Sequence, residues 1–193
     1  EVSKSVSDIV LADDSFPTIV KAIKEGRRIF DNIRNVLVYL LTGNIAEVLV
    51  VLLGMIYGIE IFLPIQLLYI NLITDSIPAI ALAFEKEKDN ILKEKNRKSD
   101  KAFFTPFIIS KIAISSFIKT FAVLTVFLVS IKIFSQETAV TMTFLSLILI
   151  EIIYAFSCRN LKESIINKKI FQNKKLNISI IMLILVQIIF FLT

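Results

Sequence analysis

PIQLLYINLITDSIPAIALAFE, residues 64–85, is an almost unbroken apolar stretch that carries an Asn, an Asp and a Pro near its middle. It lies in an apolar run of 24 residues from Ile61 to Phe84. A helix of about 20 residues crosses the roughly 30 Å hydrocarbon core of a bilayer. An ionised side chain at the centre of such a helix costs about 2.5 to 3.5 kcal/mol, so it is usually functional. The stretch therefore predicts a membrane span with a polar functional site at its centre.

Four further apolar runs of similar length surround this one in the sequence. Of the 193 residues, 55% are hydrophobic, and the mean hydropathy is +0.76, which is too apolar for an ordinary soluble domain. We therefore expect an all-α fold, a polytopic transmembrane helix bundle with the lipid bilayer as its surroundings. The predicted helices cover about residues 36–59, 61–84, 107–134, 138–158 and 177–193.

The basic residues form three groups that alternate with the predicted spans. Six Lys and Arg residues precede Val36, seven lie between Glu85 and Lys101, and six lie between Arg159 and Lys175. By the positive-inside rule this pattern places the N-terminus and both basic loops in the cytoplasm. We therefore interpret the positive charge as a sign of membrane orientation, and we expect no nucleic-acid partner. The bias toward Ile, Lys and Asn suggests a bacterial plasma membrane.

A long helix is predicted to enter the first span from the cytoplasm. Asp14 or Ser15 caps a helix with Pro17 in its first turn, and apolar residues then recur with a period near 3.6. No further Pro interrupts the chain until after residue 63, so one helix of about 60 Å would include a stalk at residues 17–35 and the first span. The alternative is an amphipathic helix that lies on anionic lipid. Residues 1–16 are expected to end a cytoplasmic domain, since the chain resembles a piece of a longer protein.

Three acidic residues lie near one depth inside the predicted spans: Glu47, Asp75 and Glu151. Helical spacing places Asn44 on the face of Glu47, and it places Asn71 on the face of Asp75. Pro78 removes a backbone donor three residues after Asp75, so the helix should break there and expose the Thr74 oxygens. With no His and only one Cys, any cation site must consist of oxygen ligands, and several carboxylates favour Ca²⁺ over monovalent ions.

A structural alternative remains for these polar side chains. Asn44 and Asn71 would then bridge helices through hydrogen bonds, and the acids would pair with Lys119 in the third span. Lys119 would otherwise face the bundle or extend to the interface. One ammonium group cannot neutralise three carboxylates, which favours the cation site.

Three segments resemble the C-terminal part of type II P-type cation-transporting ATPases, closest to the Ca²⁺ pumps of the sarco/endoplasmic-reticulum kind. They are VSDIVLADDSFPTIVKAIKEGRRIFDNIRN (6–35), LTGNIAEV (41–48) and residues 64–85. The resemblance implies that residues 1–16 end the phosphorylation domain and that residues 36–193 form the C-terminal transmembrane domain. It also implies an enzymatic parent protein, which uses ATP and Mg²⁺ in cytoplasmic domains outside this chain. Those domains and the N-terminal membrane helices would be the partners of this chain.

The resemblance also implies a set of ligands for the transported Ca²⁺. One ion would be bound by Asn44, Glu47, Thr74, Asp75 and Glu151, and a second by Asn71 and Asp75 with help from an upstream helix. Asn71 favours the Ca²⁺ pumps over the Na⁺/K⁺ pumps, which are expected to have Asp there. The presence of Glu151 favours two ions per cycle.

Two other functions stay open at this stage. One is a Na⁺/K⁺ or H⁺ pump of the same fold, and the other is a non-catalytic polytopic membrane interaction module with structural acids. The chain itself contains no phosphorylation or nucleotide-binding segment, so no catalytic residue is expected in it.

Overall fold

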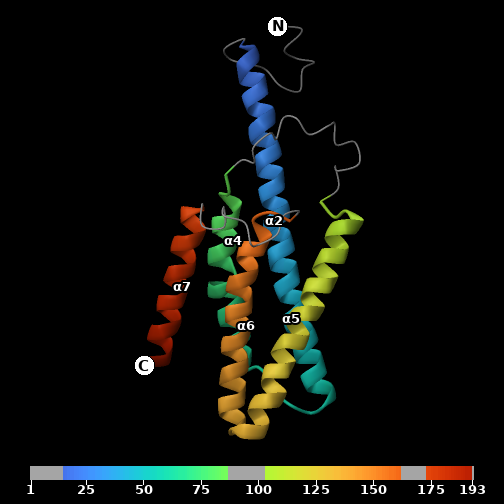
Figure 1. Ribbon diagram of the computed structural model, residues 1–193, viewed down its shortest axis with the longest axis vertical. Coiled ribbons are helices and arrows are strands. Elements are labelled where there is room, and N and C mark those ends of the chain that lie inside the picture. The colour runs from blue at the N-terminus through green and yellow to red at the C-terminus, as the bar shows by residue number, and fades with distance from the viewer. Residues whose placement is uncertain (1–14, 87–102, 162–172, 193) are drawn as a thin grey trace.

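The computed structural model describes residues 15–86, 103–161 and 173–192, with side chains as far as residue 189 (Figure 1). Every regular element in these ranges is a helix, as the all-α prediction requires. Residues 1–14, most of the segment expected to end a cytoplasmic domain, lie outside the described residues. The elements are α2 (Phe16–Ile56), α3 (Pro64–Tyr69), the π-helix η1 (Ile70–Thr74), α4 (Ser76–Ala83), α5 (Pro106–Ile133), α6 (Gln136–Cys158) and α7 (Lys174–Leu192).

Helix α2 is one unbroken helix of 41 residues, which corresponds to about 60 Å. Ser15 is extended before it, and Pro17 occupies its first turn, where a missing N–H costs nothing. Its first buried residue is Asp31, and the preceding part projects beyond the other helices (Figure 1). The prediction of a continuous helix through the stalk and the first span is thus confirmed. We call the side of the bundle where α2 projects the stalk end.

Helix α2 ends at Ile56, three residues before the expected boundary. Gly58 has a φ of 68°, a left-handed conformation that favours glycine. The Ile59 amide donates to the Gly54 carbonyl at 2.9 Å, and the Gly58 amide donates to the Met55 carbonyl at 3.1 Å. This pair of bonds is a Schellman motif, which satisfies the last carbonyls of the helix and turns the chain back.

The second span differs from the predicted range at its start. Residues 61–63 are not helical, and α3 begins at Pro64, where the fixed φ of proline suits a first helical turn. Its α-helical bonding then stops at η1, where the Asp75 amide donates to the Ile70 carbonyl, five residues back, at 2.9 Å. Helix α4 resumes after Asp75, with Pro78 in its first turn. The chain thus departs from α-helical geometry near the predicted break but stays helical, because η1 begins eight residues before Pro78 and ends four residues before it.

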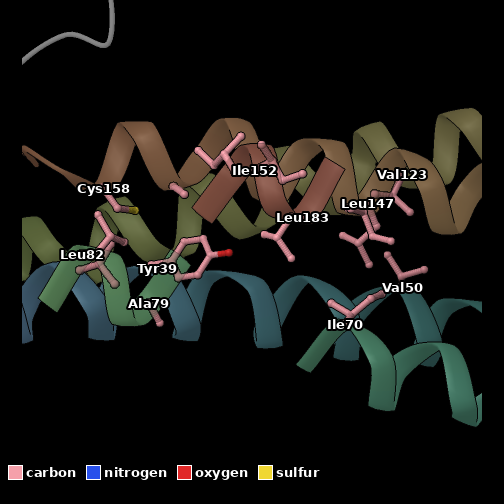
Figure 2. Close-up of a cluster of buried hydrophobic side chains, with 14 of the residues drawn as sticks. Tyr39, Val50, Ile70, Ala79, Leu82, Val123, Leu147, Ile152, Cys158 and Leu183 are labelled. Carbon is pink, nitrogen blue, oxygen red and sulfur yellow. The ribbon is translucent and has the colours of Figure 1, made fainter. Parts of the chain in front are cut away.

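Helices α5 and α6 form an antiparallel hairpin that packs against α2 (Figure 1). Thr105 caps α5 by accepting a bond from the Ile108 amide, and Ser135 caps α6 by accepting one from Thr138. The apolar core runs along the contacts between these helices and α4 (Figure 2). Large apolar side chains on the outer faces, such as Phe117 and Phe121, are exposed, as expected where a protein meets lipid.

Four helices of the described part are long and apolar enough to cross a membrane: α2, the α3–η1–α4 segment, α5 and α6. Helix α7 matches the fifth predicted span in position and packs against α4. Those four do not include α7, whose side chains are described only as far as residue 189. Its crossing of the membrane therefore stays a prediction.

A polar cluster joins four helices at the stalk end. The Arg159 guanidinium donates to both carboxylate oxygens of Glu85, at 2.9 and 2.7 Å. Asn173 also donates to Glu85, at 2.6 Å, and Asn32 donates to the Glu85 carbonyl at 2.9 Å. Asn35 donates to the Arg159 carbonyl at 3.0 Å. These bonds tie α2 to the ends of α4, α6 and α7.

Replacement of Glu85 by Gln should lower the stability of the bundle, because Arg159 would lose its charged partner in a mostly buried site. We expect a loss of about 2 kcal/mol or more in the free energy of unfolding. The matched control is Glu25→Gln, which breaks the exposed pair with Arg28 and should cost at most about 0.5 kcal/mol. Cys158, the only cysteine of this chain, is buried, so its thiol labelling on heating in detergent reports the opening directly. Equal melting temperatures for both variants would contradict this assignment.

Candidate cation site

One face of α2 presents polar groups to the interior of the bundle. Tyr39, Gly43 and Glu47 are spaced four residues apart and therefore lie on one side of the helix. All three are buried. Asn71 donates from Nδ2 to the Oε2 atom of Glu47 at 2.8 Å, which joins α2 directly to η1.

The π-helical segment places two of the predicted ligands in the interior. Thr74 ends η1 and Asp75 follows it, and their side chains are 0% and 1% exposed. The Tyr39 hydroxyl donates to Oδ1 of Asp75 at 3.4 Å. Because π-type bonding adds a residue to the turn, it changes which side chains face the bundle, and π-bulges are frequent at functional sites.

Three buried oxygens at this position have no hydrogen-bond partner: Glu47 Oε1, Thr74 Oγ1 and Asp75 Oδ2. A buried polar atom without a partner costs about 1 to 3 kcal/mol, so such atoms are rare in native proteins and need an explanation. Carboxylate and hydroxyl oxygens are the ligands that hard cations such as Ca²⁺ prefer. The donor set therefore fits a cation that these groups would bind between α2 and η1.

The third carboxylate has a protein partner. Lys119 of α5 donates to both oxygens of Glu151, at 2.8 and 2.7 Å, and both side chains are buried. Lys119 also lies over the ring of Tyr154, with Nζ 3.9 Å from the centroid. The structural alternative considered from the sequence thus holds for Glu151, and Lys119 faces the bundle. It does not hold for Glu47 or Asp75, because the one ammonium group is already used.

Gly43 lets the acidic side chains approach α2. A Cβ atom at this position would lie 3.1 Å from Glu151 Oε1 and 3.4 Å from Asp75 Oδ2. A hydrogen in place of a side chain thus leaves room for both carboxylates beside the α2 backbone. Residues from α2, from the end of η1 and from α6 therefore meet at one place in the bundle.

The six predicted ligands do not all converge. Asn44 is exposed on α2, and Asn71 is largely exposed although it bonds to Glu47. In residues 15–86, 103–161 and 173–192, no three side chains of Asp, Glu, Cys or His are arranged closely enough to hold a metal ion by themselves. Glu47 bonds to Asn71 and Glu151 bonds to Lys119, so two of the three carboxylates have a protein partner.

Tyr39 was not among the predicted site residues, although it contacts Asp75 directly. Its spacing of eight residues from Glu47 was a usable signal, since residues at i, i+4 and i+8 share one helix face. A buried tyrosine next to a carboxylate also needs a partner for its hydroxyl. No helical spacing could indicate which acid pairs with Lys119, because Lys119 lies on α5 and Glu151 lies on α6.

Together, the fold and these buried groups define a polytopic helical membrane protein with acidic side chains inside its bundle. Residues 59–193 match the family described as "Cation transporting ATPase, C-terminus", and the chain belongs to this family.

Similar proteins carry names that agree with this family. A calcium-transporting ATPase of Bacillus subtilis (strain 168) is 35% identical over 176 residues, which are 90% of this chain and 20% of that protein. Calcium-transporting ATPase 1 of Bacillus cereus (strain ATCC 10987 / NRS 248) is 32% identical over 209 residues, 97% of this chain and 23% of that protein. Calcium-transporting ATPase 3, endoplasmic reticulum-type, of Arabidopsis thaliana is 42% identical over 108 residues, which are 55% of this chain and 11% of that protein. The chain spans about a fifth of the length of the bacterial relatives.

Replacement of Gly43 by Ala should weaken cation binding, because the added methyl group would press on Glu151 and Asp75. An overpacking cost of about 1.4 kcal/mol corresponds to about tenfold weaker apparent affinity. The measurement is the cation concentration for half-maximal activation of the full-length protein. Gly26→Ala is the matched control, because a Cβ there meets nothing within 4 Å and the helix should gain slightly in stability. An unchanged affinity in Gly43→Ala would show that close approach at this glycine is not needed.

Proposed function

We propose that this chain is the ion-binding membrane portion of an ATP-driven Ca²⁺ pump, in which Ca²⁺ is the transported substrate. The observation that carries the proposal is the set of three buried, unpartnered oxygens on Glu47, Thr74 and Asp75. Thr74 and Asp75 lie at the end of a π-helical turn in a candidate membrane helix, and such turns are frequent at functional sites. The names of the bacterial and plant relatives point to the same ion.

The proposed ligands are Asn44, Glu47, Asn71, Thr74, Asp75 and Glu151. Glu47 and Asp75 supply charge, and Thr74 supplies a neutral oxygen from the end of the π-helical turn. Asn71 positions Glu47 through its amide nitrogen, which leaves its amide oxygen for the ion. Asn44 is exposed in this chain, and we propose that the N-terminal membrane helices of the same pump cover that face.

Helix α2 is suited to couple the ion site to a soluble domain. It is continuous from its exposed beginning to the level of Glu47, so a push or tilt at the stalk, residues 17–35, would move a ligand. In the proposed pump, residues 1–16 complete the phosphorylation domain, and ATP and Mg²⁺ act in cytoplasmic domains outside this chain. The N-terminus then lies in the cytoplasm, and the host membrane is a bacterial plasma membrane.

A Na⁺/K⁺ or H⁺ pump of the same fold is the nearest rival. Monovalent ions need less negative charge from their ligands than a divalent ion does. Two carboxylates with free oxygens beside one hydroxyl favour the divalent ion. Asn71 bonds to Glu47 through a neutral amide, so it adds no charge to the site.

Glu47→Gln and Asp75→Asn should each abolish Ca²⁺-dependent phosphorylation of the full-length protein by ATP, with at least a hundredfold loss of apparent affinity, about 2.7 kcal/mol. Each change removes a negative charge and a free oxygen from the site. Phosphoenzyme formation is measured against free Ca²⁺, with Na⁺, K⁺ and acidic pH as separate arms. Glu137→Gln, at the exposed start of α6, is the matched control and should leave activation unchanged.

Normal Ca²⁺ activation in both site variants would refute the site. Activation of the unaltered protein by Na⁺ or by acid, with no response to Ca²⁺, would be compatible with the fold but would show that the transported ion is not Ca²⁺.

A further inference from the structure

We infer that the ammonium group of Lys119 serves as a built-in cation at Glu151, so that the protein binds one Ca²⁺, between Glu47, Thr74 and Asp75. This inference rests on the proposed function and concerns the number of ions. It departs from the two ions that the family resemblance implied, and it removes Glu151 from the proposed ligands because that carboxylate pairs with Lys119. Lys119 is thereby assigned as the residue that sets the stoichiometry of the site.

Lys119 supplies Glu151 with a positive charge inside the bundle and makes its contacts there. Its Nζ atom lies 2.8 and 2.7 Å from the two oxygens of that carboxylate and 3.9 Å from the ring centroid of Tyr154. An ammonium group has three N–H donors, and these partners account for all of them. Lys119 is 4% exposed and Glu151 is 0% exposed, so water does not compete for the pair.

Neighbouring hydrogen bonds fix Lys119 at this position. Ser116 donates to the Thr42 carbonyl at 3.0 Å. It lies one turn before Lys119 on the same face of α5, so this bond holds that face against α2. Tyr154 is held as well, because its hydroxyl is 3.2 Å from Thr42 Oγ1 and its ring stacks on Tyr39.

The charges inside the bundle agree with a single divalent ion. Glu47, Asp75 and Glu151 together with Lys119 carry a net charge of minus two when all are ionised. One Ca²⁺ neutralises that charge, whereas a second ion would leave an excess of positive charge among buried groups. The buried oxygens without a hydrogen-bond partner near the site lie on Glu47, Thr74 and Asp75, which is where the single ion would bind. Both oxygens of Glu151 are bound by Lys119.

The test is equilibrium binding of radioactive Ca²⁺ to the purified full-length protein, expressed per phosphorylation site. We expect one ion per site with a Hill coefficient near one for the unaltered protein. Lys119→Met frees both oxygens of Glu151 and should raise the stoichiometry to two. Lys132→Met, at the exposed end of the same helix, is the matched control and should still bind one ion.

A second variant covers the case in which Lys119→Met leaves Glu151 unpaired and does not fold. Lys119→Met combined with Glu151→Gln removes both charges and should bind one ion with an affinity within about threefold of the unaltered protein. Two ions on the unaltered protein would overturn the inference, and so would a loss of affinity of about tenfold or more in the double variant. A folded Lys119→Met variant that binds one ion also overturns it. No Ca²⁺ binding by the unaltered protein would defeat the proposed function itself.

Discussion

Hydrocarbon offers no partner for a charge or a hydrogen bond, and this constraint governs every polar residue inside the bundle. An unpaired carboxylate at the centre of a membrane helix costs about 2.5 to 3.5 kcal/mol even on the lowest scales. Each of the three central acids accordingly has a protein contact: Glu47 with Asn71, Asp75 with Tyr39, and Glu151 with Lys119. The difference among them is that Glu47 and Asp75 each keep one oxygen without a partner, whereas Glu151 keeps none. In our account, Glu47 and Asp75 are therefore available to bind an ion, whereas Glu151 is paired inside the protein.

The same constraint explains the form of the second span. Irregular backbone at membrane depth is tolerated only inside the protein or along a cavity. The π-helical turn before Asp75 therefore packs against α6 and bonds to α2 through Asn71 and Glu47, and Thr74 at its end is fully buried. Gly43 lets the two carboxylates approach α2, and the cluster around Glu85 and Arg159 holds the helix ends together at the stalk end. Hydrogen-bonded and packed helices thus surround the π-helical turn.

Much of this arrangement follows from local sequence. Span length, the absence of Pro from residues 18–63 and the NLITDSIP segment predicted the helices, the long α2 and the break beside Asp75. The helix start at Pro64 was missed, because apolar residues 61–63 continue the hydropathy pattern without continuing the helix. Contacts between helices are less accessible, since they depend on the rotation of each helix about its axis. From the sequence alone, Lys119 could therefore pair with any of the three acids. Nothing in the sequence indicated that Asn44 is exposed.

The most direct test of the ion site is a structure of the full-length protein determined in a lipid nanodisc with and without Ca²⁺. Our account predicts a Ca²⁺-dependent density bound by oxygens of Glu47, Thr74 and Asp75 beside the π-helical turn, which should remain irregular while the ion is bound. It also predicts that Lys119 stays on Glu151 in that structure. An ion at another position, or closure of the turn into a regular α-helix with Glu47 and Asp75 paired to protein groups alone, would contradict the account.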